Sequence, residues 1–119
     1  MKMRFGVGMG RSESVNEVGE HARLAEDCGF ELVTLVDEPF LARDIFTALA
    51  MVAVNTERVL IGHGVVDPLT YFPTALGNAA ATLNELSGGV RSWAWGRAGR
   101  PASSWIRCHS SSSRNQCSF

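Results

Sequence analysis

The chain has no surplus of either charge. Its 11 lysines and arginines stand against 12 aspartates and glutamates, which leaves a net charge of -1. This balance gives no indication of a nucleic-acid or membrane surface. No stretch approaches the roughly 20 consecutive apolar residues of a membrane span, and Met1 leads into an alternating run without the apolar core of a signal peptide. We therefore expect a cytoplasmic protein that binds neither nucleic acid nor membrane.

Cysteine is also scarce, and its spacing has no metal or redox pattern. Cys28, Cys108 and Cys117 form an odd set without a CxxC pair. We predict no metal site from them. Cys28 is most simply interpreted as a buried helix residue.

Apolar periodicity over the first 89 residues predicts alternating strands and helices. Ser14 with Glu17 forms a capping box, Asp44 is a second helix cap, and Pro73 suits the first turn of a third helix. The expected strands are residues 3–9, 32–36 and 59–62, and the expected helices are residues 15–28, 45–53 and 73–86.

The order βαβαβα, with long crossovers, predicts parallel strands and leaves two architectures to compare. A dinucleotide-binding fold requires GxGxxG after the first strand. Here Gly6, Gly8 and Gly10 are spaced GxGxG, and Arg11 stands where a third fingerprint glycine would be. The sequence therefore favours an α/β fold that is the N-terminal βαβαβα portion of a TIM (β/α)8 barrel, incomplete.

In such a barrel the chemistry lies where the strands end, which directs attention to residues 8–12, 37–40 and 62–73. Asp37 and Glu38 directly follow a buried strand, where burial and mutual repulsion favour a general acid or base. A solvated pair of loop carboxylates is the alternative. Residues 62–73 combine glycines, prolines and apolar side chains, a composition that suits contact with a flat, apolar ring.

Three segments together resemble a known family. Residues 61–73 (IGHGVVDPLTYFP), 35–38 (LVDE) and 83–89 (LNELSGG) are similar to the luciferase-like monooxygenase family. The resemblance covers residues 3–89. Within it, the pattern of residues 61–73 is most similar to the branch that uses the deazaflavin coenzyme F420, typified by methylenetetrahydromethanopterin reductase. It implies a barrel that holds a flavin or deazaflavin at the strand ends and performs hydride transfer or monooxygenation on a small-molecule substrate.

The same resemblance implies roles for particular residues. Asp37 and Glu38 match a strand-end pair that faces the ring, and are the candidate catalytic residues. The Gly64-Val65 bond matches a non-prolyl cis peptide in a bulge behind the ring. The implied cofactor-binding residues are Gly8, Asp37, Gly64, Val65, Val66 and Asp67.

Several residues depart from the pattern of the branch. Asp67 replaces an asparagine, and Leu69, Tyr71 and Phe72 replace tyrosine, arginine and histidine. These differences leave FMN open as an alternative to coenzyme F420. His63 is interpreted as a strand-end residue and not as a catalyst.

The pattern changes after Gly89, which divides the chain into residues 1–89 and 90–119. Dropping one base would convert Trp93 and Trp95, each with the base that follows its codon, into glycine codons and restore a Gly-x-Gly strand of the family. We hypothesise that residues 90–119 are an out-of-frame or disordered tail. A genuine basic tail is the alternative.

Three strand-helix units of eight cannot close a barrel. We therefore expect a luciferase-like oxidoreductase that is inactive as this fragment, with sheet edges open to homo-oligomer formation or aggregation. The alternative is a non-enzymatic short α/β protein that acts through self-association or partner binding.

Overall fold

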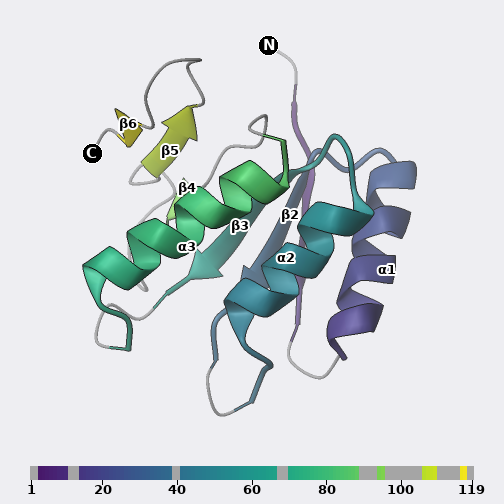
Figure 1. Ribbon diagram of the computed structural model, residues 1–119. Coiled ribbons are helices and arrows are strands. Elements are labelled where there is room, and N and C mark those ends of the chain that lie inside the picture. Colours follow the sequence, from purple (N-terminus) through teal and green to yellow (C-terminus); the bar gives the residue numbers. More distant parts are fainter. Residues whose placement is uncertain are drawn as a thin grey trace.

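A computed structural model describes residues 3–10, 14–38, 41–66, 70–88, 94–95, 106–109 and 116–117 (Figure 1). The elements in chain order are β1 (Gly6–Met9), α1 (Val15–Asp27), β2 (Leu32–Val36), α2 (Ile45–Asn55), β3 (Leu60–Val65), α3 (Pro73–Leu86), β4 (Ala94–Trp95), β5 (Ile106–His109) and β6 (Gln116–Cys117).

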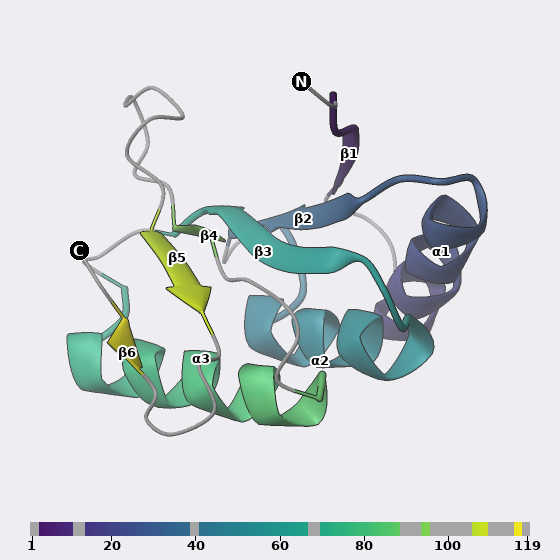
Figure 2. The same cartoon turned by 90° about the horizontal axis from the view of Figure 1, so that it is seen from above.

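The first three strands form one parallel sheet in the order β1-β2-β3. Helices α1, α2 and α3 all lie on one side of this sheet, as Figure 2 shows from above. The predicted N-terminal βαβαβα portion of a barrel is therefore confirmed. A barrel of this kind covers its outer face with helices and turns the opposite face inward.

Local sequence signals set the helix ends. The Ser14 side chain accepts from the Glu17 backbone N–H at 3.3 Å, and Glu17 accepts from the Ser14 N–H at 2.7 Å, which completes the capping box. Asp44 accepts from the Thr47 N–H at 2.8 Å at the start of α2. Gly29 and Gly88 have positive φ angles of 90° and 80°, which stop α1 and α3.

The expectation that Cys28 is a buried helix residue was wrong. The helix ends at Asp27, and Cys28 is an exposed C-cap residue. Its N–H bonds back to the carbonyl of Leu24 at 2.9 Å, and the chain turns away at Gly29, so the thiol lies beyond the part of α1 that packs on the core.

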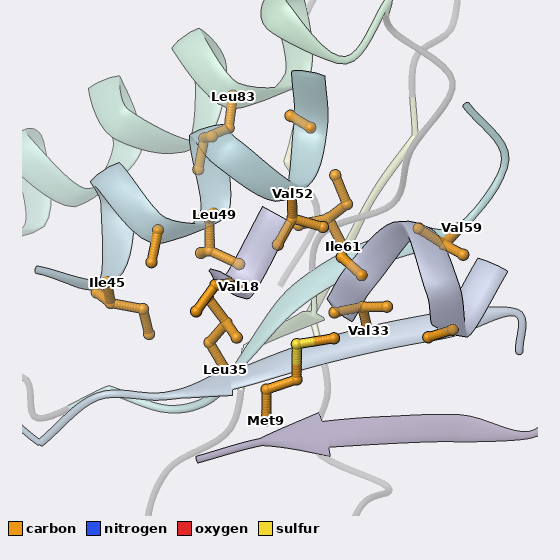
Figure 3. Close-up of a cluster of buried hydrophobic side chains, with 14 of the residues drawn as sticks. Met9, Val18, Val33, Leu35, Ile45, Leu49, Val52, Val59, Ile61 and Leu83 are labelled. Carbon is orange, nitrogen blue, oxygen red and sulfur yellow. The ribbon is translucent and has the colours of Figure 1, made fainter. Parts of the chain in front are cut away.

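The hydrophobic core lies between the sheet and the helices (Figure 3). Alternation along each strand directs one set of side chains toward the helices. The core residues from the strands and helices include Met9, Val33, Leu35, Ile61, Val18, Ala22, Ile45, Leu49, Val52 and Leu83. The opposite face, defined by Gly6, Gly8, Leu32, Thr34, Leu60 and Gly62, is called the inner face below.

Two strand boundaries differ from the sequence-based expectation. The first strand begins at Gly6 and not at Met3, because residues 3–5 lie before the section that pairs with β2. The third begins at Leu60 and continues through Val65, into residues that were expected to form a loop.

The short strands β4, β5 and β6 pair antiparallel, and β4 lies near β3. Within the described ranges, no helix combines the length and apolar character needed to cross a membrane.

Candidate functional site at the strand ends

The C-terminal edge of the sheet, defined here as Gly8, Asp37, Glu38 and residues 64–66, gathers the residues that the sequence singled out. Asp37 and Glu38 follow β2 directly, and both are half-buried. The Glu38 carbonyl accepts from the N–H groups of Leu41 at 2.9 Å and Ala42 at 2.8 Å. This turn fixes the backbone of the acidic pair between β2 and α2.

A recess lies beside this turn, between the ends of β1 and β2 and the start of α2. Its lining includes Gly10, Val36, Ala42 and Arg43. The recess therefore combines the backbone of Gly10 with Arg43, an exposed residue.

Tyr71 lies against Asp37. Its hydroxyl donates to Asp37 Oδ1 at 3.3 Å, and its ring meets Phe46 edge-on, with centroids 5.3 Å apart and planes at 87°. Burial, then the charges of Asp37 and Asp44, raise the pKa of Tyr71 to about 12. The phenol therefore stays protonated and able to donate at neutral pH.

Sequence reasoning gave Tyr71 no individual role, although it lies within residues 62–73, one of the three segments expected at the strand ends. The resembling branch has an arginine at this position.

The register between β2 and β3 shifts at Gly64. Leu35 is opposite His63, whereas the next residue, Val36, is opposite Val65. Gly64 is thus the extra residue of a bulge, as expected. Val66, just beyond it, is buried at 5% exposure, and Asp67 lies outside the described residues.

The expected cis peptide between Gly64 and Val65 was wrong, because every peptide bond within the described residues is trans. A non-prolyl cis bond costs about 3 kcal/mol and persists only where its surroundings enforce it. Here the bulge takes up the extra residue with trans geometry.

His63 lies inside β3 and has 0% exposure. It follows Ile61 by two residues and is opposite Leu35, so it faces the helices and not the inner face. Burial lowers the pKa of His63 to about 4, which keeps the imidazole neutral at neutral pH. The interpretation of His63 as a strand-end residue was wrong, since β3 continues to Val65.

Glycines leave the inner face bare toward the strand ends. Gly8 and Gly62 lie in register on either side of Thr34. A Cβ at Gly8 would be 3.6 Å from Thr34 Oγ1, and one at Gly64 would be 3.6 Å from the Leu35 carbonyl, which are ordinary contacts. Neither glycine has a positive φ. The fold itself therefore does not require glycine at these positions, although glycine in a strand weakens it.

No three histidine, cysteine or acidic side chains gather as metal ligands in the part of the chain that the structure describes. What the strand ends offer is a flat glycine-lined surface beside two carboxylates and a phenol, suited to a planar organic ring.

A one-sided parallel sheet with acids at its strand ends defines part of a (β/α)8 barrel that carries its site at the C-terminal edge. Comparison with known proteins identifies which barrel this is: the model of the luciferase-like monooxygenase family matches residues 1–103, and the chain belongs to that family.

Named relatives agree with this assignment. A 5,10-methylenetetrahydromethanopterin reductase from Methanolobus tindarius is 34% identical over 87 residues, which cover 73% of this chain and 26% of the relative. The chain thus spans about a quarter of that relative's length.

Solved structures give the same fold. The coenzyme F420-dependent tetrahydromethanopterin reductase from Methanopyrus kandleri matches with a TM-score of 0.73 and 25% identity, over 80% of this chain and 27% of that one. A monooxygenase from Streptomyces bottropensis matches with a TM-score of 0.70 and 28% identity, over 85% of this chain and 35% of that one.

Proposed function

We propose that this chain carries part of the coenzyme-binding site of a luciferase-like oxidoreductase, and that the coenzyme is the deazaflavin F420. The likeness to reductases from Methanolobus tindarius and Methanopyrus kandleri, the latter dependent on coenzyme F420, supports hydride-transfer chemistry. The likeness to a monooxygenase keeps FMN and oxygen insertion as the alternative within the same family.

The observation that carries the proposal is the absence of a side chain at Gly8 on the inner face and at Gly64 in the bulge. Both positions would accept a Cβ without a clash, so the absence of side chains serves something other than the packing of this chain. A planar ring that approaches the backbone closely is such a reason. The apolar surroundings, with Val66 buried beside the bulge, favour a ring over a charged ligand.

Bound coenzyme F420 would supply a two-electron hydride donor or acceptor. A substrate that gains or loses a hydride also exchanges a proton, and a carboxyl group at the strand ends is suited to carry it. We assign that role to Asp37, with Glu38 as the second candidate. Gly8, Gly64, Val65, Val66 and Asp67 complete the proposed contact surface for the ring.

We further propose that the 119-residue polypeptide does not turn over by itself. Its parallel sheet has three strands in the described residues, and a ring held from one side loses the contacts that later strands of a barrel supply. Residues 90–119 are proposed to be an out-of-frame segment, separate from the barrel portion formed by residues 1–89.

An NMR titration tests the binding proposal, because it detects weak complexes in a chain of this size. Coenzyme F420 is added to the isotope-labelled chain, and FMN is added to a second sample. We expect the amide signals of Gly8, Gly62 and Gly64 to shift with F420 more than with FMN, while the amide of Arg58 at the other end of β3 stays in place. Shifts confined to the helices, or none at all, would refute the proposed site.

A pair of glycine variants supplies the control. Gly8→Ala adds a methyl group to the inner face, whereas Gly77→Ala adds one to the exposed face of α3, where nothing lies within 4 Å. We expect Gly8→Ala to weaken the F420-dependent shifts several-fold and Gly77→Ala to leave them unchanged. If the two variants behaved alike, Gly8 would have no part in binding the ring.

An activity assay tests the proposed inactivity of the 119-residue chain. Redox turnover of F420 by this chain would contradict the proposal.

Sequencing the encoding DNA from the Leu86 codon, and translating the frame one base ahead, tests the proposed origin of residues 90–119. A Phe-Val-Leu-Gly-Leu-Gly strand followed by further strand-helix units is expected, and early stop codons would overturn that origin.

Self-association is a second candidate function, favoured by exposed apolar side chains just before β1 and on α1. Met3 and Phe5 are 72% and 62% exposed, and Leu24 on α1 is 60% exposed. β1 lies at the edge of the sheet, where a second copy can pair. Sedimentation over a concentration series should show oligomers that Phe5→Lys removes. A monomer at all concentrations would exclude this candidate.

A further inference from the structure

Tyr71 is the only tyrosine of the chain, and it joins three elements at the C-terminal edge. Its hydroxyl donates to Asp37, which follows β2 and is 34 positions away in the sequence. Its ring rests edge-on against Phe46 of α2, and its own backbone lies just before α3. The side chain is half-buried and packs against the hydrophobic core.

These contacts restrict Asp37 in a specific way. A carboxylate at a strand end has several accessible rotamers, and a hydrogen bond from a fixed donor selects the one that reaches it. Tyr71 is a fixed donor because Phe46 holds its ring at the favoured perpendicular geometry, with centroids 5.3 Å apart. It is also a donor at neutral pH, because the ordinary pKa of a phenol is about 10, and burial, then the charges of Asp37 and Asp44, raise the pKa of Tyr71 to about 12.

We propose that Tyr71 is a positioning residue, whose hydroxyl holds the Asp37 carboxylate at the C-terminal edge in the orientation that serves the proposed ring site. Phe46 supports Tyr71 in turn. This inference rests on the proposed function, because it assigns Tyr71 a role only through Asp37. A purely structural hydroxyl would bond to Asp37 without changing how that carboxylate meets a ligand.

The first experiment tests the contact without any ligand. Fluorotyrosine incorporated into the chain labels Tyr71 alone, and fluorine NMR then follows the ionisation of its phenol with pH. Asp37→Asn should lower the midpoint by about one pH unit, Asp44→Asn by less, and the distant control Asp27→Asn should leave it unchanged. An unchanged midpoint in Asp37→Asn would overturn the proposal at its base.

The second experiment separates positioning from ring binding. Coenzyme F420 is titrated into the wild-type chain and into Tyr71→Phe, with the amides of Gly8 and Gly64 and the side-chain carboxyl carbon of Asp37 observed together. In the wild type we expect all three signals to move. In Tyr71→Phe the glycine amides should still move, while the response of the Asp37 carboxyl carbon should fall at least twofold.

The possible failures of this experiment are distinguishable. Equal Asp37 responses in the two proteins, with moving glycine amides, would overturn the positioning role and leave the proposed function standing. Glycine amides that stay still in the wild type would refute the proposed function, and the positioning role would fall with it.

Discussion

Two carboxylates at opposite edges of the sheet are held in very different ways. Glu26 of α1 lies at the N-terminal edge, defined as Glu26 with residues 57–59, and has 8% exposure. Its oxygens accept from the N–H groups of Glu57, Arg58 and Val59 at 2.6–3.1 Å. Asp37, at the C-terminal edge, is half-buried and accepts a 3.3 Å hydrogen bond from the Tyr71 hydroxyl.

The different hydrogen bonding of Glu26 and Asp37 indicates different roles for the two edges of the sheet. Burial alone would raise the pKa of Glu26, yet the three backbone N–H groups hold it below its ordinary value, so the ionised carboxylate is the form that the fold stabilises. It ties α1 to the turn between α2 and β3. At the C-terminal edge, Asp37 instead accepts from a side-chain hydroxyl, that of Tyr71. The N-terminal edge therefore stabilises the fold, whereas the C-terminal edge is where we propose ligand chemistry, as is usual in barrels of this class.

The largest expected effect comes from removing the Glu26 side chain. Glu26→Ala leaves three N–H groups, partly or fully buried, without their acceptor, and should lower the free energy of unfolding by about 4 kcal/mol. Urea denaturation measures this loss. The matched control is Glu20→Ala on the exposed face of the same helix, which should change stability by less than about 0.5 kcal/mol. Similar losses in both variants would remove the special role of Glu26.

Acid should destabilise the fold through His63. The folded pKa of about 4 lies below the ordinary value of 6.5, so the unfolded chain binds a proton first as the pH falls. Stability is therefore full above pH 6.5 and decreases toward pH 4, by about 2 kcal/mol near pH 5. Glu26 adds a loss at lower pH, because its depressed pKa stabilises the fold only while the carboxylate is ionised.

A substitution of His63 checks this pH dependence. Urea denaturation at several pH values should show a flatter slope between pH 6.5 and 5 in His63→Gln than in the wild-type chain. An unchanged slope in His63→Gln would assign the loss to other groups.

Helix packing at Gly19 should be sensitive to a single methyl group. A Cβ there would lie 2.6 Å from Asn55 Nδ2, at the close approach of α1 and α2. We expect Gly19→Ala to cost about 1–2 kcal/mol from overpacking, despite the better helix propensity of alanine. Gly77→Ala, in open space on α3, should instead raise stability by about 0.5–1 kcal/mol. Thermal unfolding distinguishes the two signs.

The smallest expected effect is at the C-terminal edge. Tyr71→Phe removes one hydrogen bond to a half-buried acceptor and should lower the free energy of unfolding by about 1 kcal/mol or less. A loss as large as that of Glu26→Ala, measured by the same urea denaturation, would mean that both edges serve stability alike.

The sequence predicted the elements well where local signals were strong. The bounds of β2 and α3 agree with the expected residues 32–36 and 73–86. A continuous run of apolar and β-branched residues marks β2, and Pro73 at the start and Gly88 after the end mark α3. The third strand extends beyond the expected residues 59–62, because Gly62, His63 and Gly64 have the composition of a loop and so conceal its continuation. Pairing with β2 and burial of His63 override that preference.

The site was predictable only in part. Asp37 and Glu38 follow from their place after a buried strand, and the bulge at Gly64 was implied by the family resemblance. The contacts of Tyr71 with Asp37 and of Glu26 with the Val59 N–H join residues more than 30 positions apart. No local sequence pattern predicts such contacts. The trans geometry of the Gly64-Val65 bond likewise depends on how β3 pairs with β2 around the bulge, which the local sequence does not specify.

The central claim is that the two edges have separate tasks, and a comparison of Glu26→Gln with Asp37→Asn tests it most directly. Both variants replace a carboxylate with an amide of the same shape. Urea denaturation at neutral pH should show a loss of about 2 kcal/mol for Glu26→Gln and less than about 0.5 kcal/mol for Asp37→Asn. Equal losses, or a larger loss for Asp37→Asn, would contradict the account.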